Sequence, residues 1–240
     1  MGRAREGLTI KAQRLIMIDP NKKEPLPINS NEVCHSAFEL IGEKRYDEAE
    51  QLLTINMSRT DDDTSIALYH SVLGVISKIR GEYKTAWRHY ERAEKLMPED
   101  PAIKTIIARL LISQFSECSQ AIKKAKKVLV VAKGNPVFAH QAYTTMGLAY
   151  CKQGERTKAL DMLQMSWGDD FTGFVTAENI DFELLEIILR REWGEDLCKM
   201  FLLKALDFAK NTNEEDYIKL FEKMLDVFNI DYPSNEKNLS

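Results

Sequence analysis

Hydrophobic residues along this chain recur at intervals of three and four, which is the spacing of one face of an α-helix. The clearest case lies near the C-terminus, where the apolar positions are Tyr217, Leu220, Phe221, Met224, Leu225 and Phe228. A similar pattern runs from Asp181 to Phe208, whereas the stretch around Phe171 and Phe174 lacks it and is predicted to be a loop. The pattern predicts an all-α protein.

A longer period runs through the first two-thirds of the chain. It is marked by alanines that are 37, 35 and 38 residues apart: Ala49, Ala86, Ala121 and Ala159. Two of these segments carry a fuller pattern, H-x-x-L-G-x-x-S over residues 70–77 and Y-x-x-M-G-x-x-Y over residues 143–150. A period of this length indicates stacked helix-turn-helix repeats.

These offsets resemble the tetratricopeptide-repeat (TPR) family, over residues 31 to about 167. The resemblance implies a right-handed α-solenoid of TPR-like helix-turn-helix hairpins with a helical C-terminal cap. The first unit lacks the aromatic and glycine half of the motif, and the third has Arg109 where the family has a glycine. The expected organisation is an N-terminal arm and Pro-containing linker (1–30), about four repeats (31–168), a loop (169–180), an atypical helical hairpin and capping helix (181–230), and a flexible tail (231–240).

Four glycines predict how the helices pack and end. Gly74 and Gly147 lie within helices, where glycine costs about 1 kcal/mol relative to alanine, so a neighbouring helix should approach them closely. For Gly74 the expected neighbour is Tyr90. Gly81 and Gly154 fall where the first helix of a hairpin should end, and both should adopt a left-handed conformation.

Composition narrows the class of protein. The chain has 240 residues, of which 44% are hydrophobic and 29% charged, and its net charge of −4 argues against a dedicated nucleic-acid binder. The longest aliphatic run, residues 128–132, is far shorter than the roughly 20 residues of a membrane helix, and the N-terminus lacks a secretory pattern. The cysteines form no C-x-x-C pair, as is usual for buried thiols in a reducing compartment: Cys34, Cys118, Cys151 and Cys198. We therefore expect a cytoplasmic protein.

No segment carries a recognisable catalytic or metal-binding motif. The four histidines lack the spacing of a metal pair: His35, His70, His89 and His140. Cys34 and His35 are neighbours, but adjacent helical residues point about 100° apart, so a buried cysteine beside a surface histidine is expected. His70 should be a packed ring, and the acidic loop RTDDDTS should cap the helix that begins near Thr64. We expect no enzymatic activity, no cofactor and no metal.

One segment is rich in lysine. Lys123, Lys124, Lys126, Lys127 and Lys133 should form the solvated outer face of a helix whose inner face carries Ala121, Ala125, Val128 and Ala132. A patch for an acidic partner is the alternative interpretation. Nucleic acid is disfavoured, because no aromatic or arginine residues are interleaved with the lysines.

In the TPR family, the first helix of each unit lines a concave groove that binds the partner. The resemblance assigns this groove to Phe38, Ile41, Leu68, Val75, Lys78, Ile79, Ile103, Ile106, Leu110, Thr144, Leu148 and Lys152. These residues are largely aliphatic, so the Lys, Asn and Arg clamp with which one subfamily binds a C-terminal carboxylate is absent from the sequence. An apolar groove requires an occupant: either a segment of another protein, or this chain's own N-terminal arm or C-terminal helices. The third alternative is that the register is misread and these residues are core.

The sequence therefore favours a protein–protein interaction module, that is, an adaptor, scaffold or chaperone. It would bind an apolar helical or extended segment of a partner in the groove, with Lys78 and Lys152 orienting the ligand. The alternative is a regulatory sensor that binds a small signal or peptide in a closed pocket and then changes its affinity for a target. Phe171 and Phe174 would form one wall of this pocket. The sequence does not predict the oligomeric state.

Overall fold

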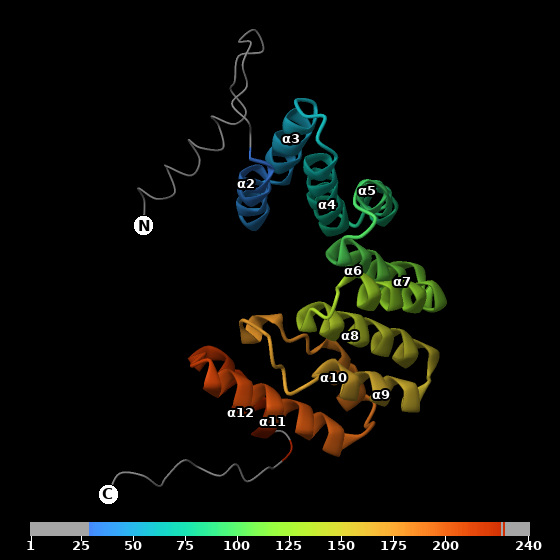
Figure 1. The fold of residues 1–240 in the computed structure, drawn as a ribbon, viewed down its shortest axis with the longest axis vertical. Helices are drawn as coiled ribbons and strands as arrows, with labels where there is room; N and C mark the ends of the chain where they lie inside the picture. The colour runs from blue at the N-terminus through green and yellow to red at the C-terminus, as the bar shows by residue number, and fades with distance from the viewer. Residues whose placement is uncertain (1–28, 227, 229–240) are drawn as a thin grey trace, which may run out of the picture. The chain divides into compact units, whose positions relative to one another are not determined.

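The computed structural model describes residues 29–226 and 228, and the regular elements in this part of the chain are all helices (Figure 1). The prediction of an all-α fold is confirmed. The predicted N-terminal arm up to residue 28 and the predicted tail lie outside the described residues. The chain divides into two compact units, of which one ends at Ile107 and the other begins at Ala108.

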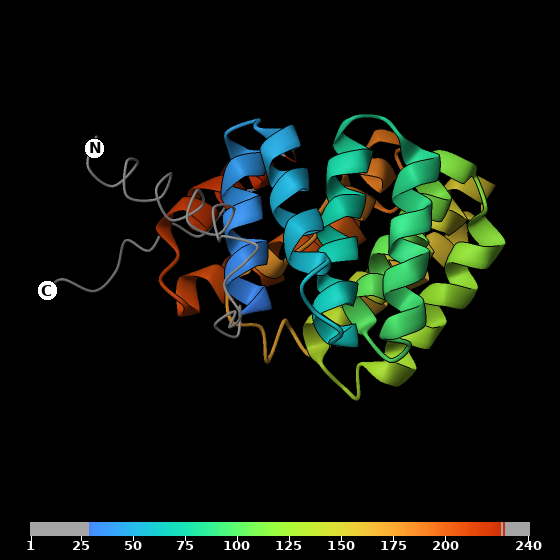
Figure 2. The ribbon, with the colours of Figure 1, turned by 90° about the horizontal axis from the view of Figure 1, so that it is seen from above.

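The first unit contains two helical hairpins. Helices α2 (Ser30–Gly42) and α3 (Tyr46–Met57) form the first hairpin, and α4 (Asp63–Ile79) and α5 (Tyr83–Leu96) form the second. Helix α6 (Pro101–Leu110) begins in this unit and ends in the next. Figure 2 shows the two members of each hairpin lying side by side.

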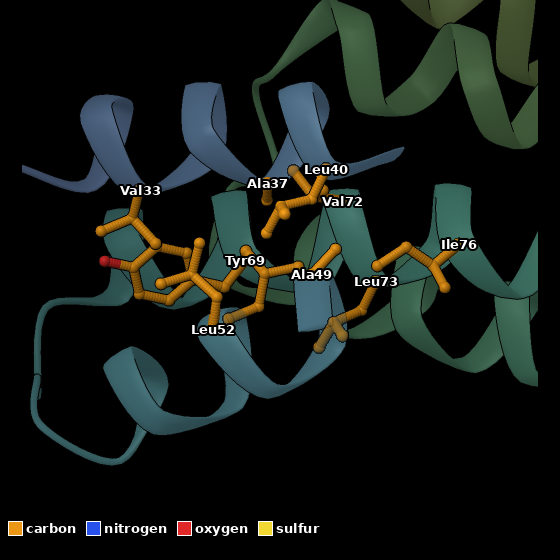
Figure 3. Close-up of a cluster of buried hydrophobic side chains, with 10 residues drawn as sticks. Val33, Ala37, Leu40, Ala49, Leu52, Tyr69, Val72, Leu73 and Ile76 are labelled. Atoms are coloured by element: carbon orange, nitrogen blue, oxygen red, sulfur yellow. The ribbon is translucent and has the colours of Figure 1, made fainter. Parts of the chain in front are cut away.

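The two hairpins share one hydrophobic core, to which α2, α3 and α4 contribute side chains. Its buried residues are drawn in Figure 3: Val33, Ala37, Leu40, Ala49, Leu52, Leu53, Tyr69, Val72, Leu73 and Ile76. The alanines that mark the sequence period, Ala49, Ala86, Ala121 and Ala159, are all completely buried. The period therefore follows the positions at which helices pack most closely.

The ends of α4 follow from the local sequence. Asp62 is its N-cap, and its carboxylate accepts hydrogen bonds from the Ser65 amide (2.8 Å) and the Ser65 hydroxyl (2.7 Å). The predicted capping role of the acidic loop is confirmed. Beyond the other end, Gly81 has a φ of 78°, and Gly154 has a φ of 76° directly after α8. Both glycines thus adopt the left-handed conformation that was predicted for them.

At the start of the second unit a π-helix interrupts the regular α-helical pattern. Helix α6 continues directly into a π-helix, η1 (Leu111–Phe115), and Ser116 then turns the chain with a φ of 59°. Helix α7 (Cys118–Val131) follows and packs against both η1 and α8 (Pro136–Gln153). Helix α9 (Arg156–Ser166) completes a hairpin with α8.

The chain after α9 folds back onto this hairpin. A loop containing the short 3-10 helix η2 (Ala177–Asn179) leads to α10 (Glu183–Arg190), α11 (Glu195–Asn211) and α12 (Glu215–Asp226). Helix α10 packs against α8 and α9, and α11 packs against α9 and α12. In the loop, Phe171 and Phe174 are buried and their rings lie against His140, Phe201 and Phe208. These two phenylalanines are therefore packed within the second unit.

Candidate functional site

Six of the predicted groove residues lie on α2 and α4, the first helices of the two hairpins in the first unit. Because successive helical residues are turned by about 100°, the two on α2 fall within roughly 60° and the four on α4 within roughly 100°. We call this set the α2–α4 face: Phe38 and Ile41 on α2, and Leu68, Val75, Lys78 and Ile79 on α4.

The α2–α4 face is apolar and accessible. Phe38 is 49% exposed and Ile79 is 47% exposed, which are large values for side chains of this kind. Ile41, Leu68 and Val75 are half-buried. Two neighbouring helices thus present apolar side chains to water.

The backbone beneath this face is held by packing and by ion pairs. Val72 of α4 and Leu40 of α2 lie together in the shared core (Figure 3). Directly after α4, the Arg80 guanidinium donates to the carboxylates of Asp47 and Glu50 on α3, each at 2.5 Å. The end of α4 that carries Lys78 and Ile79 is therefore attached to α3 as well as packed on α2.

Four predicted groove residues are instead buried, with exposed fractions of 4% for Ile103, 2% for Leu110, 1% for Thr144 and 5% for Leu148. Ile103 and Leu110 share one side of α6 with the fully buried Ile107. Thr144 and Leu148 are buried because α7, α9, α10 and η1 all pack against α8. A buried side chain offers a ligand no surface to desolvate, so the assignment of these four residues to an open groove is corrected: they are core residues. Ile106 is half-buried.

The two predicted lysines differ in their surroundings. The Lys152 ammonium donates a hydrogen bond to the carbonyl oxygen of Ile112 in η1, at 2.7 Å. It therefore supports the irregular π-helical turn. Lys78 is exposed and has no ion-pair partner in the part of the chain that the structure describes, which leaves its charge free to meet a ligand at the edge of the α2–α4 face.

On another side of α4, two histidines join it to α5. The Nδ1 atoms of His70 and His89 are 3.0 Å apart and share a hydrogen bond, so at least one of the two rings is neutral. Burial lowers the pKa of His70 to about 4 and also lowers the pKa of His89. The prediction that His70 is a packed ring is confirmed. Its partner lies 19 positions away on a different helix, and no spacing rule identified it.

A third histidine is the centre of a buried network in the second unit. His140 is 1% exposed; its Nδ1–H donates to the Ser166 carbonyl oxygen at 2.8 Å, and its Nε2 accepts the Asp181 amide at 2.8 Å. These two bonds require the neutral ring, and desolvation lowers its pKa accordingly. The Asp181 carboxylate in turn accepts from Arg109, which also donates to Glu183 at 2.6 Å.

This network includes Arg109, the residue at which the third unit was expected to depart from the TPR motif. Where the family has a glycine, Arg109 reaches the start of α10, more than 70 residues later in the chain. Sequence reasoning missed the network because its members come from separate segments and form no local motif. Its hydrogen bonds join segments that are far apart in the chain, so the network stabilises the fold.

The fold can now be compared with solved structures. TTC0263, a thermophilic TPR protein from Thermus thermophilus, matches with a TM-score of 0.56 and 19% sequence identity, over 82% of this chain and 99% of that one. This chain has the TPR fold. The resemblance that the sequence indicated is thus confirmed at the level of structure.

Two further solved structures match most of the chain. PilW, a type IV pilus biogenesis factor, gives a TM-score of 0.53 at 17% identity, over 86% of this chain and 95% of that one. BtubC from P. vanneervenii gives 0.57 at 17% identity, over 99% and 94%. At these identities the likeness concerns the fold alone. No protein-family model and no curated protein sequence matches the chain at a significant level.

Side chains suited to chemistry are sparse in residues 29–226. This part of the chain contains no group of three or more His, Cys, Asp or Glu side chains that could hold a metal ion. None of its helices combines the length and the hydropathy that a bilayer crossing requires.

The four cysteines are free thiols, three of them buried and Cys34 half-buried. Burial raises the pKa of Cys34 to about 11 and that of Cys198 to about 12, so these thiols stay protonated.

Proposed function

We propose that this chain is a protein-binding module without catalytic activity of its own, and that its α2–α4 face binds an apolar segment of a partner protein. The observation that carries the proposal is the half-exposure of Phe38 and Ile79 on neighbouring helices of one packed unit. Repeat proteins of this kind use such extended surfaces for binding. The cellular role would be that of an adaptor, scaffold or chaperone in the cytoplasm.

We also propose how the helices divide into repeats. The pairs α2–α3, α4–α5, α6–α7 and α8–α9 correspond to four repeats, and α10 to α12 form the C-terminal cap. The binding residues would then come from the first two repeats alone, since the corresponding positions of α8 are buried.

The energy of binding would come mainly from desolvation. Covering the exposed half of a phenylalanine side chain, about 100 Å², contributes about 2–3 kcal/mol, and Ile79 adds a comparable amount. Ile41, Leu68 and Val75 extend the apolar contact around these two anchors. Lys78 favours an acidic or carbonyl group at one end of the bound segment. An amphipathic helix or an extended chain with apolar anchors satisfies these requirements.

The test compares two double variants. Phe38→Asp/Ile79→Asp places two charges on the α2–α4 face, whereas Val175→Asp/Leu220→Asp makes the same change at two exposed side chains of the second unit, which are 86% and 41% exposed. Peptides are selected on the wild-type protein from a displayed library, and their dissociation constants are measured by fluorescence polarisation. Circular dichroism confirms that each variant is folded.

We expect the face variant to lose about tenfold or more in affinity, which is a modest loss for two apolar anchors, and the control variant to lose less than about twofold. Equal affinities for the face variant and the wild type would exclude the α2–α4 face as the site. A variant that lacks residues 1–28 tests whether the chain's own N-terminal arm occupies the face. If this variant binds the selected peptide more tightly than the full chain does, the arm competes for the face.

A further inference from the structure

Helix α7 carries a strip of exposed residues opposite its buried side. Lys123, Lys126, Lys127 and Val130 lie within about 100° of one another around the helix, and all four are exposed, Val130 to 77%. The buried residues of the helix occupy the opposite arc: Cys118, Ala121, Ala125 and Val128. We call the four exposed residues the α7 strip, and it points away from the core of the second unit.

The lysines of the α7 strip do not hold the fold together. None of the three forms an ion pair or a side-chain hydrogen bond within residues 29–226. The helix contains four lysines and no acidic residue, although the chain as a whole has a net charge of −4. Like charges three and four positions apart on a helix repel each other. The arrangement therefore weakens the isolated helix, and no ion pair of these three lysines among the described residues offsets the repulsion, which favours a role at the surface.

We propose that the α7 strip binds an acidic segment of a partner protein. Carboxylates along that segment would pair with Lys123, Lys126 and Lys127, and an aliphatic side chain would cover Val130. The strip extends over seven residue steps, or about 10 Å at 1.5 Å per residue, which suits one and a half to two turns of an acidic helix. This site lies on the second unit and is independent of the α2–α4 face.

The composition of the strip disfavours the other polyanions. Single-stranded nucleic acid is usually bound by aromatic rings and arginines among the basic residues, and the strip has neither. An amphipathic helix on a membrane inserts a broad apolar face with large side chains, whereas the strip offers one valine. A protein segment that combines carboxylates with a single aliphatic residue matches both the charge and the apolar contact.

The experiment uses the full chain and a short fluorescent peptide of glutamates with leucine at every fourth position. The strip variant is Lys123→Glu/Lys126→Glu/Lys127→Glu. The matched control is Lys84→Glu/Lys219→Glu/Lys223→Glu, which changes the net charge equally at exposed lysines that have no ion pair within residues 29–226. Binding is measured by fluorescence polarisation at low and at physiological salt, and thermal melting verifies that both variants fold.

We expect the strip variant to lose about tenfold or more in affinity, as the loss of three exposed ion pairs implies, and the control to lose less than about twofold. Val130→Ser should lose about twofold to threefold without changing the salt dependence. Equal loss in both triple variants, or loss in neither, overturns the proposal. Binding of phosphatidylserine vesicles or of a single-stranded oligonucleotide through these lysines, without binding of the peptide, also overturns it. Because Phe38→Asp/Ile79→Asp leaves the α7 strip intact, that variant should bind the acidic peptide normally.

Discussion

Gly74 of α4 lies directly against the ring of Tyr90 in α5: a Cβ atom placed on the glycine would be 2.5 Å from Tyr90 Cε1 and 2.7 Å from Cζ. Tyr90 is only 1% exposed, so its ring has little freedom to move aside. The missing side chain is thus what allows the helices of the second hairpin to pack at this distance. Gly147 has the same relation to Leu184, a residue of α10.

The substitution Gly74→Ala should destabilise the protein. Alanine is favoured over glycine in a helix by about 1 kcal/mol, but overpacking against Tyr90 costs about 1–3 kcal/mol, and the second effect should dominate. In Gly42→Ala the new methyl group meets no atom within 4 Å, so this control should be neutral or slightly stabilising. Urea unfolding followed by circular dichroism measures both. If Gly74→Ala proves as stable as Gly42→Ala, Tyr90 does not limit the space.

Arg109 should be worth more to stability than an ordinary surface arginine. Arg109→Ala breaks its bonds to Asp181 and Glu183, and because these groups are partly exposed we expect a coupling of about 0.5–1 kcal/mol in a double-mutant cycle with Glu183→Ala. Arg190→Ala is the control, since its exposed pair with Glu186 is 3.5 Å long. A coupling free energy of zero would show that the ion pair between Arg109 and Glu183 does not stabilise the second unit.

His140 should make stability depend on pH. Desolvation lowers its pKa below the ordinary value near 6.5, so as the pH falls the unfolded chain takes up a proton before the folded protein does. The contribution of His140 is therefore complete above about pH 6.5, and it is lost as the pH falls from there toward the lowered pKa, by at most about 1.4 kcal/mol per pH unit. Free energies of unfolding measured between pH 8 and pH 5 should show a smaller slope in His140→Gln. A slope in His140→Gln equal to that of the wild type would show that His140 does not contribute to the pH dependence.

The thiols should react in a defined order. Cys34 is half-buried and the other three cysteines are buried, so a thiol reagent should modify Cys34 first in the native protein, and slowly, because burial raises its pKa to about 11. Cys34→Ser should abolish this first phase, and Cys118→Ser should not. All four thiols should react at once in denaturant. Immediate reaction of several thiols in the native protein contradicts the burial described above.

The features that were predictable from the sequence depend on neighbours within one hairpin. The helical spacing, the buried period alanines such as Ala86, the Asp62 cap and the left-handed Gly81 all follow from local geometry and from one adjacent helix. The contact between Gly74 and Tyr90 belongs to the same class, because the two residues lie in consecutive helices. For this reason the TPR fold could be recognised from the residues alone.

The features that sequence reasoning missed depend on segments far apart in the chain. Whether Leu148 lines a groove or lies in the core depends on α10 and η1, and the position of α10 depends in turn on Leu184 meeting Gly147 and on Asp181 meeting both His140 and Arg109. The hydrophobic pattern cannot predict these contacts between distant segments. Hydrophobic burial is non-directional, so the pattern indicates that a side chain is buried but not which side chain it contacts. The sequence by itself determined the hairpins and their apolar faces. Only the tertiary structure decided which of those faces stays open to water, and it left Phe38 and Ile79 half exposed while enclosing α8.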